Sequence, residues 1–198
     1  MQAWAPTIRP MHIDTHAGSS RDCRKESRGF TLIELLVTLA VAGILASIAV
    51  PAFNNFVMND RQVGTINSLV SSLNYARSEA IKRNVAGGIT VCPSVDALTC
   101  SGTNWSGGWV VIDPNPADPP LETVPALGGS DTLTVTGAAT GVTFVSSGMV
   151  TPSATTTVTI CDVRGAAYAR ELEVNSTGRV ASSSTQGLSV SGAPLVCP

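Results

Sequence analysis

Histidine is almost absent from this sequence of 198 residues, which contains only His12 and His16. Both lie in the first 29 residues, so a chain processed after residue 29 would have no imidazole at all. Histidine-based catalytic triads and histidine-containing metal sites are then excluded from that product. The rest of the chain also has no glycine-rich phosphate loop, no G-x-S-x-G pattern and no paired-carboxylate motif. The sequence therefore argues against an enzyme and predicts no cofactor and no bound metal.

Charged residues are scarce, at 13% of the chain, and they are unevenly distributed. Residues 1–29 carry five basic and three acidic side chains, whereas the rest of the chain carries seven basic and eleven acidic ones. A basic flank before an apolar run predicts that the N-terminus stays in the cytoplasm and that the following part is exported. We therefore expect a polar leader over 1–29, an apolar span over 30–51 and one exported domain over 52–198.

The apolar span is the dominant feature of the sequence. From Phe30 to Val50 it has twenty-one residues, of which Glu34 alone is charged. A helix of this length would measure about 30 Å, which matches the hydrocarbon core of a bilayer. A charge placed in lipid costs at least ~2.5 kcal/mol, so it usually has a partner. Glu34 is therefore the first candidate functional residue.

The sequence GFTLIE at residues 29–34 resembles the recognition motif of type IV prepilins and type II secretion pseudopilins. The resemblance implies cleavage after Gly29 by a prepilin peptidase and N-methylation of the new terminal residue, Phe30. It also implies that Glu34 acts in assembly by neutralising the terminal amine of the adjacent subunit. A carboxylate buried in lipid or in a helical bundle does need such a cation. An ordinary signal anchor is the alternative, and both Met1 and Met11 are possible starts.

The helical pattern continues beyond Pro51. Apolar residues recur at intervals of three and four from Phe53 to Ala80, with polar residues between them. We expect one long helix from about Phe30 to about Arg83, bent near Pro51, of which the part after residue 51 is amphipathic and packs on a domain. The Gly87-Gly88 pair is expected to close it.

After the helix, short β-branched runs alternate with Gly, Pro, Ser and Thr, which indicates strands. Trp109 lies in one of these runs and is expected to fill the core, and 114–120 is expected to be an exposed loop. The predicted fold class is α+β and pilin-like, with one long N-terminal helix packed on antiparallel sheets. The seven expected strands are 89–92, 109–113, 132–136, 142–146, 156–161, 169–174 and 179–182.

Of the five cysteines, Cys23 falls in the leader, and four remain after residue 29. No pair of them has the C-x-x-C spacing typical of zinc sites, although zinc is the competing interpretation. An even number of cysteines in an exported domain is typical of disulfides. The close spacings favour Cys92 with Cys100 and Cys161 with Cys197.

Several segments of the exported part resemble the GspH/FimT/FimU branch of the pilin superfamily. The resemblance implies a minor pilin or pseudopilin, a structural subunit of a type IV pilus assembly or tip complex. Such a protein is a single-pass protein of the bacterial inner membrane with a periplasmic C-terminal domain, and it later assembles with other pilins. A type II secretion pseudopilin is the alternative. The segments are YARSEA at 75–80, CPS at 92–94, GWVVID at 108–113, CDVRG at 161–165 and NSTGRV at 175–180.

A further alternative is a DNA receptor for transformation. Some FimT proteins are described as binding DNA through a C-terminal Gly-Arg-x-Arg pattern, but Arg179 has no second arginine two positions on. Arg164 and Arg170 could replace it if the strands bring them close, because paired arginines engage phosphates. The acidic balance of the domain instead favours a solvated Arg179 that pairs with Glu171 or Glu173.

Overall fold

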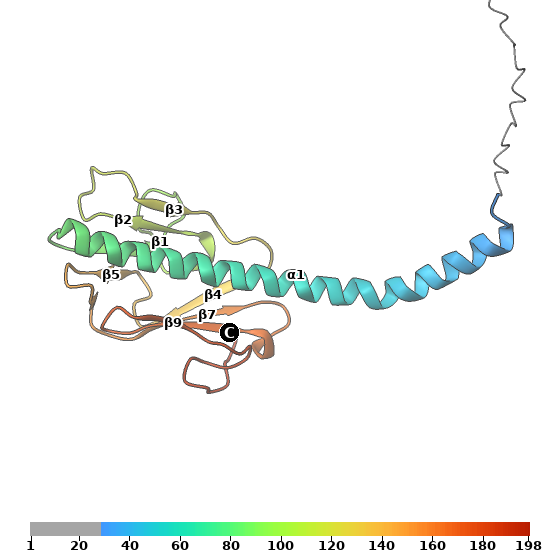
Figure 1. Cartoon of the computed structure of the whole chain (residues 1–198). Helices are drawn as coiled ribbons and strands as arrows, with labels where there is room; N and C mark the ends of the chain where they lie inside the picture. The colour runs from blue at the N-terminus through green and yellow to red at the C-terminus, as the bar shows by residue number, and fades with distance from the viewer. Residues whose placement is uncertain (1–28) are drawn as a thin grey trace, which may run out of the picture. The chain divides into compact units, whose positions relative to one another are not determined.

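The computed structural model describes residues 29–198 (Figure 1), and the leader with His12, His16 and Cys23 lies outside the described residues. One long helix, α1 (Leu32–Arg83), is followed by nine strands and two short 3-10 turns. One compact unit of the chain ends at Leu45 and the other comprises Ala46–Pro198. Pro51 lies inside α1 without ending it, so the predicted continuation of the helix is confirmed. The bend near Pro51 stays a prediction.

The C-terminal part of α1 is amphipathic, as the sequence predicts. Its buried positions recur every three or four residues, which places them on one face of the helix. The helix ends at Asn84 and not at the predicted Gly87-Gly88 pair. Asn84 adopts a left-handed φ of 51°, and its N–H donates to the Ala80 carbonyl at 3.1 Å. The buried residues are Gln62, Ile66, Leu69, Ser72, Leu73, Ala76, Glu79 and Ala80.

Gly88 has a different role, at the start of the first strand. A Cβ at this position would lie 2.3 Å from the carbonyl oxygen of Phe144, and its φ is +76°. Only glycine allows both the conformation and the approach. Gly88 therefore turns the chain from the helix into the sheet.

The strands form two antiparallel sheets. The first has the order β3-β2-β1-β5-β6 and the second the order β4-β7-β8-β9. The first comprises β1 (Ile89–Pro93), β2 (Trp109–Ile112), β3 (Glu122–Val124), β5 (Val142–Phe144) and β6 (Val150–Thr151). The second comprises β4 (Thr132–Thr136), β7 (Thr156–Cys161), β8 (Arg170–Val174) and β9 (Val180–Ser182). The 3-10 turns are η1 (Trp105–Gly107) and η2 (Ala166–Tyr168).

All seven expected strands are present, so the predicted antiparallel α+β fold is confirmed. Two strands were missed, β3 and β6. Both are edge strands of the first sheet, with three and two residues. They are held by pairing with β2 and β5 and not by an apolar run of their own.

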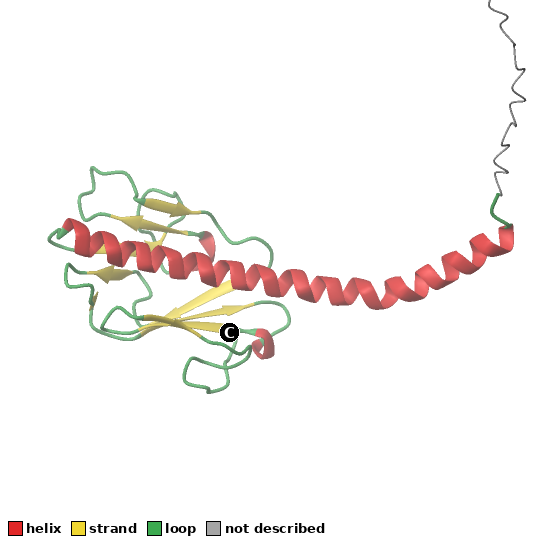
Figure 2. Cartoon of the chain, viewed as in Figure 1, coloured by secondary structure: helices red, strands yellow, loops and turns green. Residues whose placement is uncertain are grey.

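The core lies between the C-terminal part of α1 and both sheets (Figure 2). Trp109 is buried there, and its indole N–H donates to the hydroxyl of Ser72 on α1 at 3.0 Å. Trp105 is also buried, and its indole N–H donates to the Ala139 carbonyl at 2.8 Å. The predicted core role of Trp109 is confirmed, and each buried indole has the partner that it needs.

Candidate functional site

The first turn of α1 is capped by Thr31. The N–H of Glu34 donates to the Thr31 hydroxyl at 3.2 Å, and the N–H of Leu35 donates to the Thr31 carbonyl at 3.1 Å. A threonine followed three residues later by a glutamate is the pattern of a capping box. The sequence prediction overlooked Thr31, although this T-x-x-E spacing identifies it. Gly29 and Phe30 precede the helix and are exposed.

Glu34 occupies the third position of the helix. Negative charge is favourable there, because the unpaired N–H groups of the first turn carry partial positive charge. Within residues 29–198 the Glu34 carboxylate has no ion-pair or hydrogen-bond partner. The acid is therefore available to a group outside the described residues.

The side chains around Glu34 form an exposed apolar surface. Every residue from Gly29 to Val57 is exposed, and most are large and apolar. By length and composition, α1 is long and apolar enough to cross a membrane. An exposed apolar helix surface of this extent is typical of a membrane or protein interface. Its large members are Phe30, Leu32, Ile33, Leu35, Leu36, Val37, Leu39, Val41, Ile44, Leu45, Ile48, Val50, Phe53, Phe56 and Val57.

An ion pair fastens the domain part of α1 to the start of the second sheet. Arg61 donates through Nε and Nη2 to the two carboxylate oxygens of Asp131, at 2.7 and 2.8 Å. The side chain of Asp131 is fully buried. A bidentate arginine–carboxylate pair fixes geometry as well as charge. Arg61 thus holds the residues just before β4 against the helix.

Arg164 also links the loop after β7 to α1, so it is not a free surface cation. It donates to Asp162 at 2.6 to 3.2 Å and to the side-chain oxygen of Asn59 at 2.8 Å, and it stacks over Tyr168 at 4.3 Å. Gln62 also donates to Asp162, at 3.0 Å. Burial of Asp162 raises its pKa, but hydrogen bonds from Arg164 outweigh burial and leave the pKa below its ordinary value.

The strands do not bring the three predicted DNA-binding arginines together. Arg170 begins β8, and Arg179 lies in the turn beyond its other end, roughly 15 Å away at ~3.3 Å per residue. Arg164 is occupied by its contacts to Asp162 and α1. The cation that does reach the Arg179 turn is Arg77 of α1, which donates to the Thr177 carbonyl at 3.3 Å.

The predicted pairing of Arg179 with Glu171 or Glu173 is wrong. Among residues 29–198 the Arg179 side chain has no ion pair, and Glu171 accepts the N–H of Val190 at 3.0 Å instead. The backbone N–H of Arg179 donates to the side chain of Asn175 at 2.9 Å, which closes the turn. The turn is therefore held by its own backbone and leaves Arg179 exposed.

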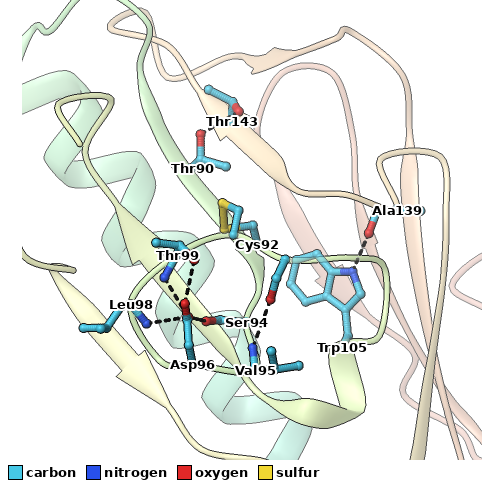
Figure 3. Close-up of a disulfide and its surroundings, with 12 residues drawn as sticks. Thr90, Cys92, Ser94, Val95, Asp96, Leu98, Thr99, Trp105, Ala139 and Thr143 are labelled. Atoms are coloured by element: carbon cyan, nitrogen blue, oxygen red, sulfur yellow. Dashed lines mark hydrogen bonds between the residues drawn. A yellow bond between two sulfur atoms is a disulfide. The ribbon is translucent and has the colours of Figure 1, made fainter.

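The structure contains the Cys92–Cys100 and Cys161–Cys197 disulfides, the pairing that the spacing predicts. The first closes a loop organised around Asp96 (Figure 3), whose carboxylate accepts from the N–H groups of Leu98 and Thr99 and from two hydroxyls. These hydrogen bonds hold the pKa of Asp96 well below its ordinary value. No group of three or more metal-ligating side chains occurs within residues 29–198.

The chain is similar to several fimbrial proteins. It is 30% identical over 86 residues to a type IV major fimbrial protein FimA of Dichelobacter nodosus, which covers 43% of this chain and 53% of the relative. It is 44% identical over 57 residues to a fimbrial protein of Pseudomonas aeruginosa, covering 29% and 36% of the two chains. The chain thus spans about half the length, or less, of the curated relatives that it matches.

The fold is similar to that of a solved minor pilin. The crystal structure of the type IV minor pilin FimU of Pseudomonas aeruginosa superposes with a TM-score of 0.56 at 24% identity. The match covers 72% of this chain and 99% of that chain. At this identity the likeness is one of fold, and it confirms the pilin-like architecture.

Two family patterns match the sequence directly. Residues 24–50 match the prokaryotic N-terminal methylation motif, which contains Gly29, Phe30 and Glu34. Residues 65–178, more than half of the chain, match the family described as type II transport protein GspH. The chain therefore belongs to the GspH family and carries the N-terminal methylation motif.

Proposed function

We propose that this protein is a minor pilin, a structural subunit of a type IV pilus. It is made as a prepilin, cut after Gly29 by a prepilin peptidase and methylated on Phe30. The exposed half of α1 then holds it in the bacterial inner membrane, with the domain in the periplasm, until it joins a filament. The observation that carries the proposal is the Glu34 carboxylate, without a partner in residues 29–198, at the capped start of an exposed apolar helix.

Assembly in this proposal has two physical components. Apolar side chains of neighbouring helices pack together, which provides affinity through close van der Waals contact. Glu34 pairs with the methylated terminal amine of the adjacent subunit, which sets the register, because an unpaired charge in an apolar bundle is costly. The same ion pair compensates both charges. The two disulfides suit the oxidising periplasm.

Deleting the gene tests the proposal. A minor pilin that primes assembly is required for surface pili and twitching motility, so both should be lost and both should return with the wild-type gene. Normal piliation in the deletion strain would contradict the proposal.

The description of the family as a type II transport protein favours a second candidate, a pseudopilin of a type II secretion system. That protein would use the same apolar helix and the same glutamate. The deletion strain separates the two candidates. Loss of exoprotein release with intact pili would assign the protein to secretion.

A further inference from the structure

Arg170 is a half-buried cation with no ion-pair or hydrogen-bond partner among residues 29–198. It begins β8 on the same face as Leu172 and Val174, both of which are fully buried, because alternate residues of a strand share a face. Its Nε is buried and has no acceptor. No carboxylate or carbonyl among residues 29–198 accepts from its guanidinium. A buried N–H of a charged group is costly to leave unpaired, so the presence of an arginine at this position calls for an explanation.

The guanidinium lines a small pocket between α1 and the β8–β9 hairpin. The pocket has a volume of about 70 Å³. This is several times the ~10–15 Å³ that one water molecule needs, yet it admits only a small group. Val63 and Ile66 of α1 form its apolar side, and Asn67, Ser182 and Ser183 contribute polar side chains.

The polar groups of the pocket include several hydrogen-bond donors. Ser183 is 8% exposed, and its hydroxyl oxygen accepts the N–H of Glu171 at 3.0 Å, which leaves the hydroxyl proton to be donated. Glu171 is the only carboxylate among the lining residues. Its carboxylate is already engaged, because it accepts the N–H of Val190 at 3.0 Å. The pocket thus combines one unpaired positive charge with hydroxyl and amide donors.

We propose that this pocket binds a carboxylate. The planar fork of an arginine matches the two oxygens of a carboxylate, and Ser183 adds a buried donor beside it. The pocket admits the head group of an aspartate or glutamate side chain, or a free carboxylate such as acetate. We expect the carboxylate to come from a side chain of a neighbouring subunit, and this expectation rests on the proposed function. The binding of a carboxylate by the pocket does not depend on the proposed function.

Thermal unfolding of the full-length protein in detergent tests the pocket. Trp105 and Trp109 are buried, so their fluorescence reports unfolding of the domain. Sodium acetate at about 100 mM should raise Tm by about 2–4 °C over sodium chloride at equal ionic strength, for a Kd of about 20 mM. Arg170→Met should abolish this shift, and Arg179→Met, which removes an exposed arginine, should preserve it. No acetate-specific shift in the wild type, or an equal shift in Arg170→Met, would overturn the proposal.

Arg170→Met should fold, because methionine places an apolar chain where an unpaired cation was. Should it fail to fold, Arg170→Lys replaces it in the test. Lysine keeps the charge without the fork, so it should lose at least half of the acetate shift. A full shift with lysine would overturn the proposal as stated.

The source of the carboxylate is tested in cells. The amount of protein in sheared surface pili is compared between Arg170→Met and Arg179→Met at equal membrane levels. A neighbouring subunit as the source predicts a drop of about tenfold for Arg170→Met alone. Unchanged incorporation together with a positive acetate result assigns the pocket to a free carboxylate. Absence of the wild-type protein from pili would defeat the proposed function and leave the acetate result standing.

Discussion

The two halves of α1 use apolar side chains for different purposes. Residues 30–57 expose theirs on all sides, whereas residues 62–83 bury one face against both sheets of the domain. The second half satisfies its apolar face within the chain, so its contribution is to folding. The first half finds no cover within residues 29–198, so its contribution is to contacts with lipid or with other subunits.

The polar residues of the two halves differ in the same way. In the domain half, Gln62 donates to Asp162, Ser72 accepts from Trp109, and Glu79 pairs with Arg83 at 2.6 Å. Glu34 in the first half has no such partner within residues 29–198. A buried or membrane-embedded polar group without a partner is either a defect or a site. The comparison therefore assigns a structural role to Gln62, Ser72 and Glu79, and it supports the assembly role proposed for Glu34.

The largest effect is expected for Glu34→Gln. The change removes the charge and keeps the shape, so the proposed ion pair with the terminal amine of a neighbouring subunit cannot form, while the domain is untouched. Incorporation into surface pili should be abolished and Tm should stay within about 1 °C of the wild type. Quantitative blotting of sheared pili and tryptophan fluorescence measure the two quantities.

Thr38→Val is the matched control for Glu34→Gln. Thr38 lies one turn further on, is exposed and donates only to the carbonyl of Leu35 at 2.8 Å. It should assemble normally. Equal loss of assembly in both variants would mean that any polar change here disrupts the surface, and the specific role of Glu34 would be refuted.

A pair of leucine substitutions tests the contrast between the halves. Leu73 is 1% exposed and Leu39 is 61% exposed. Leu73→Ala should lower the free energy of unfolding of the domain by about 2–5 kcal/mol, because it leaves a cavity, whereas Leu39→Ala should change it by less than about 0.5 kcal/mol. Chemical denaturation followed by tryptophan fluorescence measures both. Similar losses of unfolding free energy in the two variants would contradict the claim that only the second half of α1 contributes to folding of the domain.

The two disulfides should stabilise the domain unequally. Loop entropy depends on the length of chain enclosed, which corresponds to separations of 36 residues for Cys161–Cys197 and 8 for Cys92–Cys100. Replacing both cysteines by serine should cost about 4 kcal/mol for the first and about 2.5 kcal/mol for the second. Denaturation of the two double variants tests the order. A larger loss for the shorter loop would show that local contacts around Asp96 dominate.

The smallest effect is a loss of stability in acid. Hydrogen bonds from Arg83 lower the pKa of Glu79, and those from Arg164 outweigh burial to lower the pKa of Asp162. Because the unfolded chain binds these protons first, the stabilisation is complete above about pH 5 and is lost as the pH falls through the folded-state pKa values. Tm should be equal at pH 7 and 5.5 and lower at pH 3. A higher Tm at pH 3 would contradict this assignment.

Much of this architecture could be predicted from the sequence. The helix was predictable because its apolar residues keep a spacing of three and four through Pro51, and seven strands were predictable from β-branched runs. β3 and β6 were not, because Glu122–Val124 and Val150–Thr151 are held by neighbouring strands. These two segments form strands because they pair with a neighbouring strand and not because of their own composition.

The residues of the candidate site also fall into two groups, those that the sequence alone identifies and those that only the structure identifies. Gly29, Phe30 and Glu34 lie within six consecutive residues, so a local motif identifies them. The contacts that occupy Arg164 and the pocket around Arg170 join segments about 100 residues apart, and no local pattern records them. The positions of these arginines follow from the packing of strands on the helix, which becomes visible only in three dimensions.

Intact-mass analysis of sheared and purified surface pili tests the central claim most directly. The proposed pathway places in the filament a chain that begins at N-methylated Phe30 and contains two disulfides. We expect this species in wild-type pili and expect the surface-sheared fraction of a Glu34→Gln strain to lack it. A protein found only in the membrane fraction, with the leader still attached, would contradict the account.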